Sequence, residues 1–175
     1  MGRCTGNECE DKVELVMSKI IFGKKVIISD PCYEVGIWCQ KELSNVLPGV
    51  WEVDVRKANV GNYSIIAELI ARHVGYPACE ISEFESGRIA VDSGQCGFFD
   101  ADYYKRHQPD NDYNNLDSWY RRICGITLSS KRWGTVDDKG VVSDTGYGDG
   151  LYDLYISKNA DGEIVGMRVE FIEED

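Results

Sequence analysis

The chain has 175 residues, 30 of them acidic and 19 basic, and a formal net charge of −11 at pH 7. This length suits a single domain, and the acidic excess argues against a nucleic-acid or membrane-surface binder, because both of those partners are polyanionic and attract basic faces. No apolar run approaches the roughly 20 residues that cross a bilayer and no signal peptide is recognisable, so we expect a cytoplasmic protein without a membrane anchor.

Residues 1–10 are small and polar without periodicity and predict a flexible leader, which leaves 11–175 as a single β-rich domain. The β-branched run at 24–30 (KKVIISD) predicts a strand that ends in a proline turn. The stretch 33–47 has apolar residues at loose helical spacing and is followed by Pro-Gly, so it predicts a short helix.

The segment 50–55 (VWEVDV) alternates apolar and acidic residues, which is typical of a half-buried strand. Residues 64–74 fit a helix or a buried strand. We favour a strand that pairs with 50–55 as a hairpin, because a short Gly/Asn loop joins the two. Two further strand-like pieces, 87–94 and 96–99, are separated by a Ser-Gly turn.

Asp100 is suited to cap a helical turn at 100–107. A polar loop follows at 108–120 and turns helical near its end, and 123–129 (ICGITLS) predicts another strand.

The last forty residues predict consecutive strands. The sequence NADG at 159–162 is typical of a hairpin turn, and the residues after it alternate apolar with polar. The expected fold is mainly β (α+β): one antiparallel-rich sandwich or half-open barrel with a few short helices.

Three short apolar strands end in an acid followed by turn residues: IISDPCY with Asp30, IAVDSGQ with Asp92, and VVSDTGYGDG with Asp144 and Asp149. Strand ends beside glycine are where a β scaffold presents functional groups, because the sheet fixes their position. The alternative is that these aspartates only cap turns through bonds to the backbone.

Converging carboxylates favour a hard divalent cation such as Ca²⁺ or Mg²⁺, although neither an EF-hand nor a phosphate loop is present. The same carboxylates would also suit a general acid and base for hydrolysis. Cys32 is a candidate nucleophile with His73 or His107 as its base, and the alternative is a buried thiol beside two ordinary histidines. None of the seven cysteines forms a Cys-x-x-Cys pair, so a zinc finger is not expected.

Aromatic residues gather near the acidic turns, and Tyr147 stands between two glycines, where core packing does not explain it. An acidic, aromatic and glycine-rich rim would hold a flat polar ligand by stacking and hydrogen bonds. The candidate ligand-binding residues are Asp30, Tyr33, Asp92, Ser93, Gln95, Gly146, Tyr147, Gly148 and Asp149.

The segments DPCY (30–33), VDSGQCGFFD (91–100) and SDTGYGDGLYDLYISKNADGEIVGMRVEF (143–171) resemble the bacterial and phage proteins grouped as domain-of-unknown-function family 4241. The GYGDG hairpin is the most specific part of this resemblance. It implies a recurrent fold without an assigned reaction, and it implies that Asp30, Asp92 and Asp149 belong to one motif set. The phage members suggest a protein that sequesters a host nucleotide signal or blocks a host enzyme.

The leading hypothesis is a binding module for a small nucleotide-like or sugar-like ligand. The alternatives are a carboxylate-dependent hydrolase and an acidic interaction protein that covers a basic surface of a host protein. The sequence leaves open whether any reaction is catalysed, whether a metal or cofactor is bound, and which oligomeric state forms.

Overall fold

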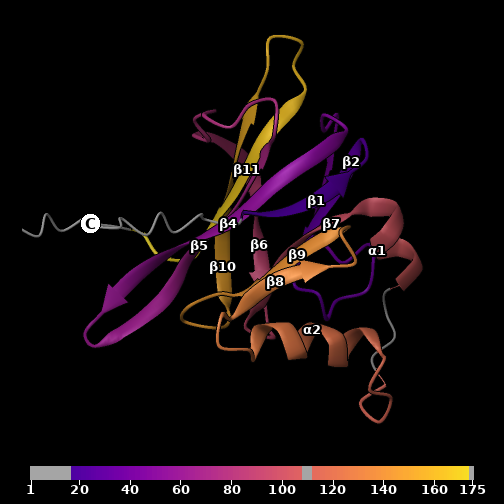
Figure 1. Ribbon diagram of the computed structural model, residues 1–175, viewed down its shortest axis with the longest axis vertical. Helices are drawn as coiled ribbons and strands as arrows, with labels where there is room; N and C mark the ends of the chain where they lie inside the picture. The colour runs from indigo at the N-terminus through magenta and orange to yellow at the C-terminus, as the bar shows by residue number, and fades with distance from the viewer. Residues whose placement is uncertain (1–16, 108–111, 174–175) are drawn as a thin grey trace, which may run out of the picture.

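The structure is a computed structural model that describes residues 17–107 and 112–173. Within these ranges the chain forms eleven β-strands and two short helices, and the strands make two antiparallel sheets that do not close into a barrel (Figure 1). The expected mainly β, sandwich-like fold is therefore confirmed. The expected leader, residues 1–10, lies outside the described residues.

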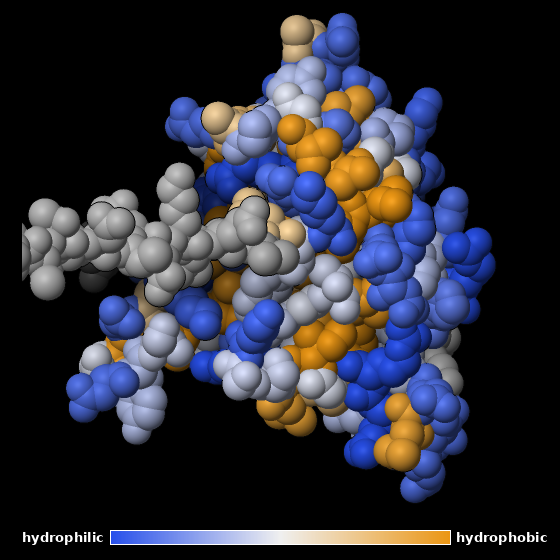
Figure 2. Space-filling model, in the orientation of Figure 1, coloured by the Kyte–Doolittle hydropathy of each residue, from blue (hydrophilic) through white to orange (hydrophobic). Residues whose placement is uncertain are grey.

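The larger sheet contains two long hairpins. Its strands, in spatial order, are β1 (Ser18–Phe22), β4 (Gly49–Val60), β5 (Tyr63–His73), β11 (Ile164–Glu170), β10 (Gly150–Lys158) and β6 (Glu83–Val91). The pairing of β4 with β5 and the turn at 159–162 between β10 and β11 confirm both predicted hairpins. Both hairpins project from the body in Figure 1, and the tip of β4–β5 is mostly hydrophilic in Figure 2, so it adds little to the core.

The smaller sheet packs face to face on the larger one. Its strands, in spatial order, are β3 (Lys41–Ser44), β2 (Lys25–Ser29), β7 (Gln95–Asp100), β9 (Gly140–Asp144) and β8 (Trp133–Val136). Alternate apolar residues from each sheet meet in one cluster, where Trp51 and Leu69 of the larger sheet join Ile28 and Phe98 of the smaller. The alternation in the sequence thus sets which face of each sheet is buried.

Two helices, α1 (Ala101–His107) and α2 (Trp119–Thr127), cover the other face of the smaller sheet. The ring of Phe99 packs between them, with its centroid 5.0 Å from that of Tyr104 and 5.4 Å from that of Trp119. The molecule therefore has three layers: the larger sheet, the smaller sheet and the helices. Neither helix in the described ranges has the length and apolar character needed to cross a membrane.

The helix predicted for 33–47 is wrong. The chain forms turns there and then strand β3, which pairs with β2. Gly36 has a φ of +91°, which breaks a helical path, and the alternation of Lys41–Ser44 buries Leu43 as a strand does.

The strand predicted for 123–129 is also wrong, because most of this segment belongs to α2. The Ser118 hydroxyl accepts a hydrogen bond from the Arg121 amide at 3.3 Å and caps the helix. Trp119, Ile123 and Thr127 then fall on one helical face and are buried. The predicted cap of α1 is confirmed, since Asp100 accepts from the Tyr103 amide at 3.0 Å.

The GYGDG segment is not a hairpin, in contrast to the expectation from the sequence. Residues 145–149 carry the chain from β9 in the smaller sheet to β10 in the larger, and 92–94 make the same kind of crossing from β6 to β7. The two crossings are adjacent, because the Thr145 amide donates to the Gly94 carbonyl at 3.1 Å. Gly146 is required here: its φ is +70°, and a Cβ atom would lie 2.5 Å from the carbonyl oxygen of Ile66.

Candidate ligand-binding site

The carboxylate of Asp30 is fully buried and joins two of the predicted turns. One oxygen accepts hydrogen bonds from the Cys32 amide at 2.8 Å and the Ser93 hydroxyl at 2.7 Å. The other accepts from the amides of Asp92 at 2.9 Å and Ser93 at 2.8 Å. Because both oxygens are occupied by protein donors, Asp30 holds the 92–93 turn in place and has little capacity left for a ligand.

The third acidic turn lies against the second. A Cβ atom on Gly94 would be 3.7 Å from Gly148 Cα and 4.0 Å from a carboxylate oxygen of Asp149. The pKa of Tyr33 is raised, first by burial of the phenol and then by nearby charges that include those of Asp30, Asp92 and Asp149. The three predicted turns therefore meet at one end of the sandwich, with the carboxylates of Asp92 and Asp149 exposed.

Gln95 points toward helix α2. Its side-chain oxygen accepts from the Thr127 hydroxyl at 2.7 Å, and its nitrogen lies 3.4 Å from the Ser93 hydroxyl oxygen. The same nitrogen lies 4.0 Å from Cys32 Sγ and 3.9 Å from Cys124 Sγ. This predicted ligand-binding residue is thus engaged by protein groups between the smaller sheet and α2.

Cys32 lacks the features of an activated nucleophile. Burial raises the pKa of its thiol to about 11, which disfavours the reactive thiolate. The ring nitrogens of His73 contact the Pro48 carbonyl at 3.3 Å and the Gly75 amide at 3.0 Å. His107 packs on the ring of Tyr103, with centroids 4.4 Å apart. The contacts in the described ranges therefore favour the alternative of an unreactive thiol and two ordinary histidines, with the Cys32 thiol partly rather than fully buried.

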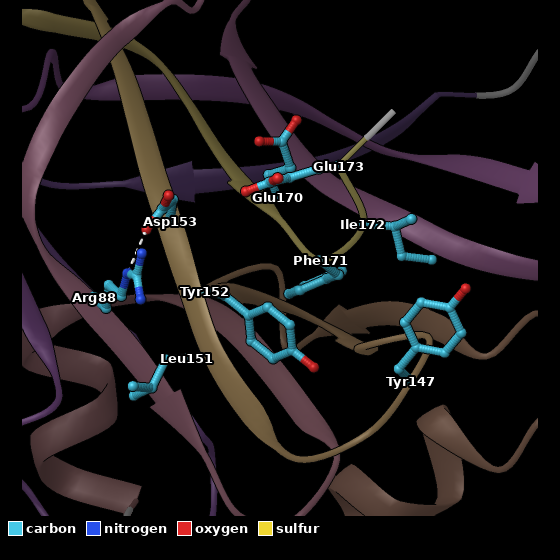
Figure 3. A pocket seen from close by; sticks show the side chains of 9 residues that line it. All are labelled: Arg88, Tyr147, Leu151, Tyr152, Asp153, Glu170, Phe171, Ile172 and Glu173. Carbon is cyan, nitrogen blue, oxygen red and sulfur yellow. Dashed lines mark hydrogen bonds and ion pairs between the residues drawn. The ribbon is translucent and has the colours of Figure 1, made fainter. Parts of the chain in front are cut away.

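Tyr147 lines a separate cavity of about 440 Å³ between the start of β10 and the end of β11 (Figure 3). The lining residues are Arg88, Tyr147, Leu151, Tyr152, Asp153, Glu170, Phe171, Ile172 and Glu173. Among the described residues that line it, none is one of the predicted aspartates. The predicted ligand set is therefore divided: the acidic turns lie on one side of the 145–149 crossing and Tyr147 faces the cavity.

Hydrogen bonds fix the crossing that presents Tyr147. The Gly148 carbonyl accepts from the Tyr152 hydroxyl at 2.6 Å and from the Thr145 hydroxyl, and the Tyr147 amide donates to the Thr145 carbonyl at 2.8 Å. Tyr152 also packs edge-on against Phe171, with centroids 5.1 Å apart, and both side chains point to the same side of the strands as Tyr147 in Figure 3. The aromatic side of the cavity is thus preorganised by these contacts.

The charged lining residues lie on the outward face of the same strands. The register of β10 and β11 places Asp153 directly opposite Glu170. Arg88 of β6 pairs with Asp153 at 3.0 Å, as the dashed line in Figure 3 shows, and Glu170 pairs with Arg168 at 3.1 Å. With Glu173 the lining has three acids and one arginine, and Arg168 pairs with Glu170 from outside the lining, so the net charge at the cavity remains negative.

The sequence does not predict that Arg88, Asp153 and Glu170 lie together, because they come from three strands that only the sheet register brings side by side. The available signal was the polar half of the alternation in the C-terminal strands, which places Asp153 and Glu170 on the outward face. In the described ranges no three Asp, Glu, His or Cys side chains are grouped as metal ligands would be, so a cation site is not supported by a donor set.

Comparisons with known proteins identify no relative of this chain. No family model, curated protein or solved structure matches the chain. The resemblance to family 4241 therefore stays a prediction, and the function has to be argued from the geometry of the molecule itself.

Proposed function

We propose that this protein is a binding module for a small polar ligand, held in the cavity between β10 and β11. The observation that carries the proposal is the position of Tyr147, which is 66% exposed although hydrogen bonds lock the crossing that presents it. An exposed aromatic ring on a backbone held by hydrogen bonds offers a stacking surface for a ligand, and the backbone needs no reordering on binding.

The lining indicates the chemistry of the ligand. A volume of about 440 Å³ suits a compact molecule, since small-molecule sites span roughly 300–1,000 Å³. Tyr147 can stack on a flat ring, while Asp153, Glu170 and Arg88 can bond hydroxyl groups. The three acids would repel phosphates, so we favour a sugar or a nucleoside over a nucleotide. The sequestration role implied by the family resemblance would then apply to a ligand of that kind.

The hydrolase alternative receives less support. Asp153 and Glu170 face each other across the strands, as a pair of catalytic carboxylates would. Each is engaged in an ion pair with an arginine, however, and neither is buried in an apolar setting. We therefore favour binding without turnover.

The experiment is a thermal-shift screen with monosaccharides, disaccharides and nucleosides, followed by titration calorimetry of any compound that raises the Tm. Ligand at about a hundred times its Kd stabilises the folded state by about 2.7 kcal/mol, enough for a clear rise in Tm. Nucleoside monophosphates serve as the comparison for the effect of a phosphate.

The matched variants are Tyr147→Ala and Tyr63→Ala. Tyr63 is 77% exposed at the tip of the β4–β5 hairpin and does not belong to the cavity lining. We expect Tyr63→Ala to bind as the original protein does and Tyr147→Ala to lose the response. A flat response to every sugar and nucleoside, or equal binding by Tyr147→Ala, would overturn the proposal.

A further inference from the structure

The loop between β2 and β3 exposes three apolar side chains that the ligand cavity does not use. Trp38 is 84% exposed, and Val35 and Ile37 beside it are exposed as well. Tryptophan is usually buried to a large extent, and exposed tryptophans are enriched among the residues that dominate the energy of protein interfaces. We refer to residues 33–38 as the Trp38 loop.

The base of the Trp38 loop is anchored to the helical layer. The Tyr104 hydroxyl donates to the Tyr33 carbonyl at 2.6 Å, and the Trp119 indole nitrogen donates to the Pro31 carbonyl at 2.7 Å. Both donors are buried core residues. Two buried donors of the helical layer therefore hold the start of the loop in place.

The far end of the loop is held by Gln40 and by strand β6. The Gly36 amide donates to the Gln40 side-chain oxygen at 2.9 Å, and the Gln40 side-chain nitrogen donates to the Ser29 hydroxyl at 2.9 Å. The Ala90 amide also reaches the Cys39 carbonyl at 3.4 Å. Because the backbone of the loop is held at both ends, less backbone entropy is lost when a partner binds.

A hollow of about 150 Å³ lies beside the exposed side chains and is lined in part by Val35, Ile37 and Ile27. Its remaining described lining comes from Gly36, Gln40 and Glu42. The surface thus combines a protruding indole with a small recess, which suits an interface in which one partner side chain enters while Trp38 enters the partner.

The exposed charges on the Tyr33 side of the loop are negative. Glu34 is exposed there, whereas the Asp30 carboxylate is buried and fully hydrogen-bonded. On the side of the hollow the charges are balanced, because Glu42 pairs with Lys25 at 3.3 Å and with Lys105 at 3.0 Å. The exposed carboxylates of Asp92 and Asp149 belong to the turns that meet beside Tyr33, and their charges help to raise its pKa. The next cation along the chain, Lys41, pairs with Glu85 at 3.0 Å.

From this combination we infer that the Trp38 loop docks a protein partner that offers an apolar pocket for Trp38 within a rim of lysine and arginine. Charge complementarity selects this occupant: nucleic acids and anionic membranes would be repelled by the acids, and two copies that each carry −11 would repel one another. The Trp38 loop is separate from the cavity that Tyr147 lines, so this inference does not depend on the proposed ligand.

The test is panning of a random peptide library against the immobilised full-length protein, with Trp38→Ala and Leu128→Ala as parallel targets. Leu128 is 85% exposed at the end of α2 and is the matched control for loss of an exposed apolar side chain. We expect the original protein and Leu128→Ala to enrich one motif in which lysine or arginine flanks a bulky apolar residue.

A synthetic peptide with the enriched motif is then titrated by fluorescence anisotropy. We expect about tenfold weaker binding to Trp38→Ala and to Glu34→Lys, and weaker binding when salt rises from about 50 mM to about 500 mM. Circular dichroism checks that both variants fold. Failure to enrich a motif, a motif without basic residues, equal binding to Trp38→Ala, or a Trp38-dependent dimer in sedimentation velocity would each overturn the inference.

Discussion

Ser93 donates two hydrogen bonds to the carboxylate of Asp30, one from its backbone amide at 2.8 Å and one from its hydroxyl at 2.7 Å. The two residues are 63 positions apart in the sequence, and the bonds fasten the turn after β2 to the crossing after β6. The Asp30 carboxylate is therefore a structural element beneath the acidic end of the sandwich, and its removal should affect folding before it affects binding.

We expect Asp30→Asn to lower the free energy of unfolding by about 3 kcal/mol, because the new amide group cannot accept the hydrogen bonds that one carboxylate oxygen now receives. Urea denaturation measures the effect. The matched control is Asp92→Asn, whose side chain is exposed and whose loss should stay within about 0.5 kcal/mol. Equal losses in the two variants would contradict the structural role of Asp30.

A second prediction concerns Ser143, whose hydroxyl is buried and has no hydrogen-bond partner among the described atoms. We expect Ser143→Ala to raise the free energy of unfolding by about 1 kcal/mol, since it removes an unsatisfied buried polar group. Ser118→Ala is the opposite case: its hydroxyl caps α2, so we expect a loss of about 1 kcal/mol. Chemical denaturation that shows the same sign for both would refute this account.

The third prediction is a pH dependence. The pKa of Asp137 is lowered by the hydrogen bond from the Tyr103 hydroxyl, 2.6 Å long, and then by Arg122. A carboxyl with a lowered pKa stabilises the fold above the usual aspartate value, and this contribution is lost as pH falls through the folded pKa. In Tyr103→Phe we expect the Asp137 pKa to rise, as measured by NMR titration of the carboxyl carbon. An unchanged value would show that Arg122 alone sets it.

The fourth prediction concerns the reactivity of Cys32. A pKa of about 11 leaves about a hundredfold less thiolate near neutral pH than an ordinary cysteine thiol would have. We expect slow alkylation of Cys32 by iodoacetamide at about pH 7.5 in the folded protein and fast alkylation in urea, followed by peptide mass spectrometry. Rapid labelling of the folded protein would contradict this prediction and support the hypothesis that Cys32 is a nucleophile.

Most of the strands could be predicted from the sequence, because strict alternation of apolar and polar residues indicates a half-buried strand. Trp51 and Val53 alternate with Glu52 and Asp54 in this way. The errors fall where the tertiary surroundings decide. The segment 123–127 contains the β-branched residues Ile123, Ile126 and Thr127, which favour a strand locally. In the fold it packs as a helix beside Phe99, where only one side of the helix needs to be apolar. The GYGDG turn resembles a hairpin because a turn between two strands carries no mark of which sheet each strand will join.

The candidate site was predicted only in part. The meeting of the turns at Asp30, Asp92 and Asp149 followed from their shared position at strand ends, which local sequence reveals. The cavity could not be predicted in this way, because the pairing of Asp153 with Arg88 depends on the register between β10 and β6. Register is a long-range property, and 65 residues separate this pair.

The two adjacent crossings also bear on how the protein folds. Strands β6 and β7 are consecutive in the sequence but belong to different sheets. The same is true of β9 and β10. Neither sheet can be completed from one continuous stretch of chain, so both must await contacts between distant segments. We expect a single cooperative transition with refolding on the order of milliseconds to seconds, typical of β-sandwiches of high contact order, with the Gly94–Thr145 junction among the last amides to exchange with solvent.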